Sequence, residues 1–300
     1  MKCFLCKKSD LSNVYSLKNK TILRCKNDKL FLGATTANNK INVYGKEYFI
    51  YSPHLSNSSY FSKKLETIQL LTSNHKPHIL DIGCGWGDFE EVLEQENIPY
   101  LGIDINKEAI KICRKKGLNC FNISLNELIL SGVASDEAIR EADLRSEGKS
   151  LTEEKSHERQ NLTKMQFDAI TMFQLIEHVK NPLSLLQSAQ KLLKPGGVIL
   201  ITTPNNDTPL RKILGSRWSV YNEPSHYVFY NRNTLTKTFH LAGFNNIQVK
   251  LDQMRFLSSN YILKRLFQMY FNWKLNIGDW KFALPIPTDS FGDLELTAST

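Results

Sequence analysis

Long apolar runs, a large set of cysteines and internal repeats are all missing from this sequence of 300 residues. No stretch approaches the roughly 20 apolar residues of a membrane span, and the first ten residues lack the apolar core of a signal peptide. The six cysteines are too few for a disulfide framework, so those that matter are expected to be reduced thiols or metal ligands. These absences argue against a multispanning or disulfide-rich secreted protein and predict a cytoplasmic one.

Composition and charge point to a folded protein with one basic end. Hydrophobic residues make up 41% and charged residues 23%, which is ordinary for a chain with a buried core. The net charge of +8 is concentrated in residues 1–50, which hold ten Lys or Arg and three acidic residues. Any contact with a polyanion is therefore expected to involve the N-terminal arm.

Short apolar segments alternate with amphipathic ones between residues 61 and 205. This rhythm predicts βαβ units and a parallel sheet with helices on both faces, with ligands bound at the carboxyl ends of the strands. A further segment, 291–299, is expected to form a final antiparallel strand at the sheet edge. The predicted strands are 78–83, 100–104, 117–123, 167–173 and 196–203, and the predicted helices are 88–96, 107–116 and 182–193.

A glycine-rich loop follows the first predicted strand. Asp81 precedes Gly83, Gly85 and Gly87, and Asp88 stands where a dinucleotide-binding loop has its last glycine. A carboxylate at that position would repel a pyrophosphate, which favours a cofactor without phosphates and disfavours a nucleotide-dependent oxidoreductase. Asp104 ends the second strand, where a carboxylate can accept hydrogen bonds from ribose hydroxyls or can cap the next helix.

With these residues, the sequence resembles the class I S-adenosylmethionine-dependent methyltransferases. The matching motifs are ILDIGCGWGDF, the acid of LGIDI, FDAITMFQLIEHVKNP, LLKPGGVILITTPN and RWSVYNEPSHYVFYNRNTLTKTFHLAGF. The resemblance implies a Rossmann-like seven-stranded sheet over residues 41–300 and methyl transfer to a small, glycan-linked or lipid-linked acceptor, at oxygen. It also implies that the three glycines and Asp104 hold the cofactor, while Phe173 and Gln174 close the pocket beneath its sulfonium. Asp81, which precedes the glycines, is also expected to bind the cofactor.

Two histidines are candidates for a general base, because histidine is the usual base near neutral pH. His178 follows the fourth strand directly, and His226 lies in the segment EPSHYVFY. Each has a structural alternative: His178 can orient or cap a turn, and His226 can pin a loop. Glu177 can contact the cofactor or pair with a base, whereas Cys84 is expected to be only a small residue in a tight loop.

The N-terminal arm carries the pattern of a zinc ribbon with one ligand changed. Cys3, Cys6 and Cys25 have the spacing of paired knuckles, and Asp28 stands in place of a fourth cysteine. Residues 1–40 are therefore predicted to form a ribbon-like segment that either holds a structural zinc ion through these four residues or folds without metal.

Three further segments suggest contacts outside the sheet. Tyr44 and Tyr48 lie in an aromatic stretch that can form a lid or pack on the sheet, and residues 133–160 form a charged insertion. The C-terminal part, 206–290, is expected to build the acceptor site. Within it one helical face can cap that site, rest on a membrane surface or pack in the core. The members of this face are Ile262, Leu266, Met269, Tyr270 and Trp273.

Two rival functions fit the same sequence. Some RNA methyltransferases also have an N-terminal zinc knuckle, and this chain is basic, although IEHV is not the motif used on flipped bases. A non-catalytic scaffold that binds the cofactor is the second rival.

Overall fold

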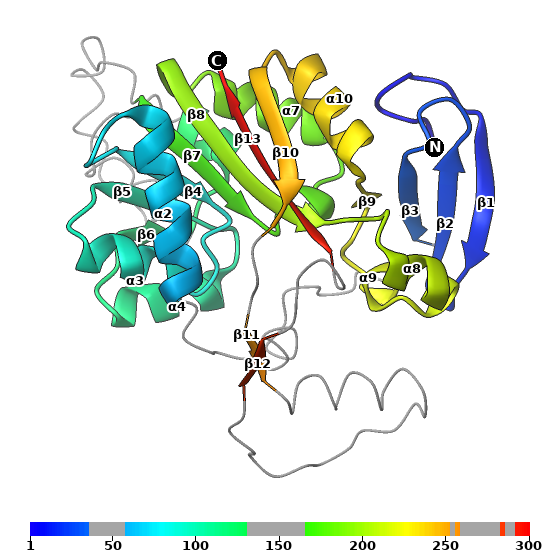
Figure 1. The fold of residues 1–300 in the computed structure, drawn as a ribbon, viewed down its shortest axis with the longest axis horizontal. Helices are drawn as coiled ribbons and strands as arrows, with labels where there is room; N and C mark the ends of the chain where they lie inside the picture. Colours follow the sequence, from blue (N-terminus) through cyan, green and yellow to red (C-terminus); the bar gives the residue numbers. More distant parts are fainter. Residues whose placement is uncertain (36–57, 131–165, 253–255, 259–282, 286–291) are drawn as a thin grey trace, which may run out of the picture.

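The computed structural model describes residues 1–35, 58–130, 166–252, 256–258, 283–285 and 292–300 (Figure 1). The predictions for Tyr44 and Tyr48, the insertion 133–160 and the helical face within 262–273 lie outside these residues. In the described part of the chain, no helix has both the length and the apolar character needed to cross a membrane.

A seven-stranded sheet forms the centre of the molecule, in the order β10-β13-β8-β7-β4-β5-β6 (Figure 1). Neighbouring strands from β8 through β7, β4 and β5 to β6 run parallel, while β13 pairs antiparallel with both β8 and β10. The strands are β4 Ile79–Ile82, β5 Tyr100–Ile103, β6 Cys120–Phe121, β7 Phe167–Phe173, β8 Leu193–Pro204, β10 Asn245–Leu251 and β13 Asp293–Ser299. The predicted α/β sheet is confirmed.

Helices cover the two faces of this sheet. Helix α2 packs against α3 and on β7 and β8, while α7 and α10 pack against each other. Apolar residues at helical spacing, such as Leu65 and Ile68 of α2, enter the core on one face, and Leu186 and Phe239 enter it on the other. The helices are α2 Ser58–Thr72, α3 Asp88–Gln95, α4 Lys107–Lys115, α5 Leu125–Leu130, α7 Pro182–Gln190 and α10 Arg232–Ala242.

The position of β13 differs from the prediction that the last strand lies at the sheet edge. It is inserted between β8 and β10, so β10 is the edge strand. The alternation of polar and apolar residues in DLELTAS is typical of a half-exposed strand, yet Glu295 and Thr297 are buried with their apolar neighbours. Glu295 tolerates burial because Lys64 of α2 pairs with it and with Asp252.

The N-terminal arm, residues 1–35, is joined to the rest of the chain through a second sheet. Strands β1 (Leu11–Ser16), β2 (Lys20–Cys25) and β3 (Phe31–Thr35) form an antiparallel sheet that β9 (Val228–Phe229) completes. Figure 1 shows the three arm strands, in blue, beside α8, α9 and β9. The remaining elements are α8 Pro209–Leu214, α9 Ser219–Asn222, the 3₁₀ helices η2 Ile176–His178 and η3 Gly215–Arg217, and the pair β11 Phe256–Ser258 with β12 Ala283–Pro285.

Aromatic packing reinforces the junction between the arm and the rest of the chain. Ile22 and Phe31 from the arm share a cluster of buried side chains with Trp218, Tyr221 and Phe229. The Phe31 and Tyr221 rings stack at a centroid distance of 6.4 Å. Because these aromatic side chains lose most of their exposed surface at this junction, the arm is part of the folded unit.

Candidate functional site

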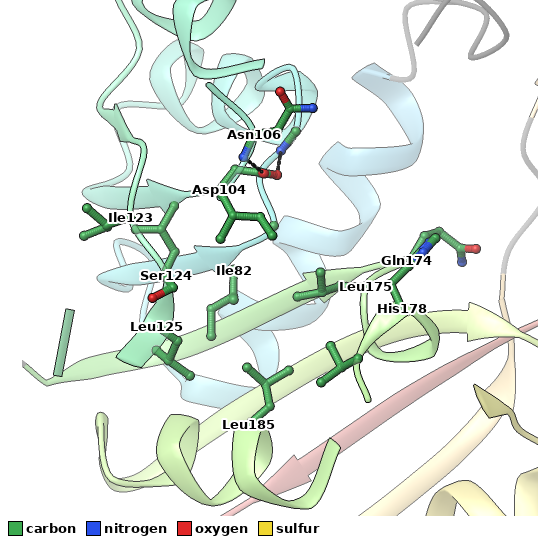
Figure 2. A pocket seen from close by; sticks show the side chains of 15 residues that line it. Ile82, Asp104, Asn106, Ile123, Ser124, Leu125, Gln174, Leu175, His178 and Leu185 are labelled. Atoms are coloured by element: carbon green, nitrogen blue, oxygen red, sulfur yellow. Dashed lines mark hydrogen bonds between the residues drawn. The ribbon is translucent and has the colours of Figure 1, made fainter. Parts of the chain in front are cut away.

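A cavity of about 260 Å³ opens at the carboxyl ends of β4, β5 and β7 (Figure 2). Figure 2 shows Asp104 and Asn106 on one side of it, Gln174 and His178 on another, and aliphatic side chains between them. The lining residues are Ile82, Gly83, Gly85, Ile103, Asp104, Ile105, Asn106, Ile123, Ser124, Leu125, Gln174, Leu175, His178, Val179 and Leu185. This is the place at which parallel α/β sheets bind their ligands.

The glycine loop between β4 and α3 forms one wall of the cavity. Gly83 has a φ of +81°, and a Cβ there would lie 2.9 Å from the Leu175 side chain. Gly87 has a φ of +79°, and a Cβ there would lie 2.4 Å from Leu118. Glycine is required at both positions because the backbone is left-handed and neighbouring side chains fill the space. Gly83 and Gly85 line the cavity, while Gly87 lies behind the loop against Leu118 and Cys113.

Asp104 is held in place by the backbone on both sides. Its Oδ2 accepts a hydrogen bond from the Gly85 N–H at 3.0 Å, and its Oδ1 accepts one from the Asn106 N–H at 2.7 Å. Burial raises the pKa of the Asp104 carboxyl above its usual value, and these two N–H groups oppose that rise. Asn106, not Asp104, caps α4, since the Asn106 side chain accepts from the Glu108 and Ala109 N–H groups. The capping alternative for Asp104 is therefore wrong.

The side chains of Phe173 and Gln174, at the end of β7, have different surroundings. Gln174 lines the cavity in the left-handed region, with a φ of +53°, which is a strained conformation for a residue with a side chain. Phe173 instead packs edge-on against Phe61 and Phe89 at centroid distances of 5.2 and 5.1 Å. It is not among the residues that line the cavity. Its predicted contact with a cofactor stays a prediction.

Asp81 lies beneath the glycine loop and is not among the residues that line the cavity, so its predicted contact with a cofactor stays a prediction. Its carboxylate accepts a hydrogen bond of 2.6 Å from the Thr171 hydroxyl. Burial raises the pKa of Asp81 to about 6, and burial together with Asp81 raises the pKa of Glu90 well above its usual value. Because both carboxyls are buried and each disfavours the charge of the other, their raised pKa values favour a proton held under the loop.

The structure brings His178 and His226, the two candidates for the general base, into contact. Their ring centroids lie 4.5 Å apart in an edge-to-face arrangement. His178 lines the cavity and hydrogen-bonds to the backbone of Ser225, while the His226 Nδ1 lies 3.0 Å from the Val220 carbonyl. Burial and the positive charge of Lys20 lower the pKa of His178 to about 4. His178 is therefore a neutral imidazole in the wall of the cavity at neutral pH.

Glu177 is buried and is not among the residues that line the cavity. It is 1% exposed, and its Oε2 accepts a hydrogen bond of 2.9 Å from the Thr203 hydroxyl. Glu177 lies next to both histidines, since its carboxylate and their ring nitrogens lie within 4.8 Å of one another. The prediction that Glu177 pairs with a base is consistent with this placement.

The four candidate zinc ligands of the arm converge. Their ligand atoms all lie within 4.8 Å of one another. The Cys6 and Cys25 sulfurs are 3.6 Å apart, and Asp28 Oδ2 lies 3.4 Å from Cys3 Sγ and 3.7 Å from Cys25 Sγ. The other oxygen of Asp28 pairs with Lys237 of α10, so this cluster also contacts the main sheet's helical layer.

Several residues of the site carry no signal in the sequence. The aliphatic wall of Leu175, Val179 and Leu185 looks like ordinary core, and Lys20 looks like a surface residue. A second group of thiols, Cys84, Cys113 and Cys120, lies buried behind the glycine loop, where Cys113 donates to the Gly85 carbonyl at 3.3 Å. These contacts arise from strands and helices that the chain brings together only on folding.

Comparison with known proteins agrees with this geometry. The family described as "Methyltransferase domain" matches residues 57–249, which is more than half of the chain. The chain belongs to this methyltransferase domain family, as the resemblance in its motifs predicted.

Particular relatives match over shorter stretches. Ubiquinone biosynthesis O-methyltransferases from Actinobacillus pleuropneumoniae serotype 5b (strain L20) and Haemophilus ducreyi (strain 35000HP / ATCC 700724) are 28% and 30% identical over 128 residues. Each alignment covers 42% of this chain and 45% of the relative, so the chain matches less than half of these proteins. The solved structure of a SAM-dependent methyltransferase from Archaeoglobus fulgidus is 19% identical, with a TM-score of 0.47 over 84% of this chain and 99% of that one.

Proposed function

We propose that this chain transfers a methyl group from S-adenosylmethionine to a hydroxyl oxygen of a small acceptor, free or linked to a glycan or lipid. The observation that carries the proposal is one cavity with a fixed carboxylate, Asp104, on one side and a neutral histidine, His178, on another. The curated relatives are named O-methyltransferases, which supports oxygen as the acceptor atom.

The residues of the cavity fit the proposed cofactor. Two acceptor positions of Asp104 are used by backbone N–H groups, and a carboxylate has further lone pairs to accept hydrogen bonds from ribose hydroxyls. The apolar Ile105, Ile123 and Leu125 would flank the adenine. When bound, the sulfonium supplies an activated methyl group whose bond to sulfur breaks as the bond to oxygen forms.

His178 has the remaining task in this mechanism. As the acceptor oxygen gains the methyl group it loses a proton, and a neutral imidazole at the cavity wall can take that proton. The edge-on ring of His226 and the hydrogen bond to Ser225 fix the orientation of His178. Alignment and exclusion of water at the aliphatic wall then account for the rest of the rate gain.

The test measures methylation and cofactor binding separately. Labelled S-adenosylmethionine is incubated with the full chain and a panel of phenols, sugar nucleotides and bulk ribosomal RNA, and S-adenosylhomocysteine release is recorded. Turnover with a phenol or sugar that His178→Gln lowers at least about 100-fold supports the proposal. His240→Gln, an exposed histidine on α10, is the matched control. Methylation of RNA alone, or full activity of His178→Gln, would contradict it.

We also propose that Cys3, Cys6, Cys25 and Asp28 hold a structural zinc ion. In a tetrahedral site with Zn–S bonds of about 2.3 Å the ligand atoms lie about 3.5–3.8 Å apart, close to the observed separations of 3.4–3.7 Å. Four protein ligands leave no open position, so the ion would be structural. Elemental analysis should find about one zinc per chain, lost in Asp28→Ala and kept in Asp10→Ala. A zinc-free protein that melts as the zinc-loaded one does would refute this.

A further inference from the structure

The N-terminal arm contacts the loop that carries His226. This loop, residues 223–227, is called the histidine loop below. Strand β3 pairs with β9, with Phe31 opposite Phe229 and Leu32 opposite Val228, and β9 begins immediately after the histidine loop. The C-terminal end of the loop is therefore fixed by a strand of the arm.

Lys20 fixes the same loop at two points. Its side chain is almost completely buried, and its Nζ donates hydrogen bonds to the carbonyls of Glu223 and of His226, the latter at 2.9 Å. Burial lowers the pKa of Lys20 to about 8, so the amine still carries its proton at neutral pH. A charged amine that bridges two carbonyls of a short loop restricts the loop more than either hydrogen bond alone.

Gly33 lets the arm come close enough for this contact. A Cβ at Gly33 would lie 2.7 Å from the His226 carbonyl oxygen and 3.0 Å from the Lys20 Cδ. The Gly33 N–H donates to the Tyr227 carbonyl at 2.9 Å. Because Gly33 has no side chain, strand β3 can lie directly against the backbone of the histidine loop.

From the histidine loop the contacts continue to the cavity. The Tyr227 N–H donates to the Glu177 carbonyl at 2.8 Å, and His178 hydrogen-bonds to the backbone of Ser225. The two imidazole rings lie edge to face. A displacement of the loop would therefore move His226 and turn the ring of His178 at the cavity wall.

We propose that Lys20 is a positioning residue of the acceptor site, through which the N-terminal arm fixes the His178–His226 pair. The proposal rests on the function proposed above and adds to it a residue far outside the part of the chain that matches the methyltransferase domain. Lys20 acts in two ways: it holds the histidine loop, and its charge favours the neutral form of His178.

Other ionisable groups surround the same histidine. Glu177 lies beside His178 on η2, and His226 faces it from the histidine loop, where Glu223 also lies close to Lys20. Lys180 lies over the Tyr227 ring at 5.1 Å. The effect of the Lys20 charge on the pKa of His178 therefore has to be distinguished from the effects of these groups. The Lys20 variants leave all of these groups unchanged.

The test compares wild type, Lys20→Met, Lys20→Arg and Lys18→Met as full chains with ¹³C-labelled histidine. Lys18 is an exposed lysine in the same arm and serves as the matched control. The pKa of His178 is measured by NMR, with its signal assigned by its loss in His178→Gln. Lys20→Met should raise this pKa by roughly one unit, as expected for removing a nearby charge and loosening the loop, while Lys20→Arg and Lys18→Met keep the wild-type value.

S-adenosylhomocysteine titration checks that the variants stay folded. Its Kd should change less than about twofold in Lys20→Met, because the arm does not line the cofactor side. Gly33→Ala, which keeps the charge but displaces the loop, should shift the His226 signal and also leave this Kd unchanged. An unchanged His178 pKa in Lys20→Met, an equal shift in Lys18→Met, or loss of S-adenosylhomocysteine binding would overturn the proposal.

These measurements need no acceptor, so the two proposals can fail separately. If the His178 pKa shifts as expected but no hydroxyl compound is methylated, the positioning role stands and the proposed function falls. If a hydroxyl acceptor is methylated equally by wild type and Lys20→Met, the proposed function stands and Lys20 has no positioning role.

Discussion

Asp104→Asn should weaken binding of S-adenosylhomocysteine by about 10- to 150-fold. Both carboxylate oxygens already accept a backbone hydrogen bond, and each keeps one acceptor position for a ribose hydroxyl. The asparagine amide leaves only one oxygen, without the charge, and turns an N–H group toward an existing donor. The loss of one hydrogen bond to a charged group costs about 1.5–3 kcal/mol, which corresponds to that change in Kd.

Isothermal titration at 25 °C measures this effect directly. Glu108→Gln is the matched control, because it removes the same charge from an exposed position on α4, where Glu108 pairs with Lys111. The wild-type affinity should also fall as the pH drops toward the raised pKa of Asp104, whereas the affinity of Asp104→Asn should not follow this titration. A Kd for Asp104→Asn within about threefold of wild type would refute the assignment of Asp104 to the ribose.

Three further predictions concern stability. Glu90→Gln should raise the free energy of unfolding by ~1–3 kcal/mol at pH 7.5. The pKa of buried Glu90 is raised on folding, so the wild type loses stability as the pH rises above the ordinary carboxyl range, and the neutral glutamine removes this loss. Urea unfolding at pH 5 and 7.5 checks this, and a less stable Glu90→Gln at pH 7.5 would contradict it. Lys64→Met should lower the free energy of unfolding by about 3–5 kcal/mol, since buried Asp252 would lose this cation and buried Glu295 would be left with the more exposed Lys250. Lys63→Met, an exposed neighbour on α2, should have little effect, and equal losses in the two variants would disprove the role of the pair. Gly87→Ala should lower the melting temperature more than Gly117→Ala. Both glycines have a positive φ, but a Cβ would collide with Leu118 at Gly87 and would meet open space at Gly117. Equal decreases in melting temperature would exclude this steric cause.

The sheet and the glycine loop were predictable because their signals are local. The strands from Ile79–Ile82 to Leu193–Pro204 alternate with amphipathic helices, and that alternation alone predicts a parallel sheet. Asp104 could be placed in the site because the carboxyl ends of neighbouring parallel strands share one edge. The order of the C-terminal strands could not be predicted in the same way. Glu295 makes β13 look half-exposed, but β13 lies between β8 and β10, where Lys64 and Lys250 both pair with the buried Glu295.

The histidine pair was also only partly predictable from the sequence. The sequence singled out His178 and His226 separately, by residue type and by position after a strand or within a polar segment. Their edge-to-face contact depends on the histidine loop returning to η2, which the Tyr227 N–H fixes at the Glu177 carbonyl. The resemblance implied that Phe173 and Gln174 both close the cofactor pocket, but β7 ends at Phe173 and the backbone of Gln174 turns into the left-handed region. Gln174 therefore lines the cavity while Phe173 packs with Phe61 and Phe89.

By itself, the sequence determined the methyltransferase class, the glycine loop and the acid at the end of β5, because each depends on residues close together in the chain. Only the tertiary structure decided that the basic N-terminal arm packs against the histidine loop. Lys20 and His226 are 206 positions apart, and a lysine in an amphipathic strand reads as a surface charge. Its burial follows from the pairing of β3 with β9, a contact between distant segments that forms only when the whole chain has folded.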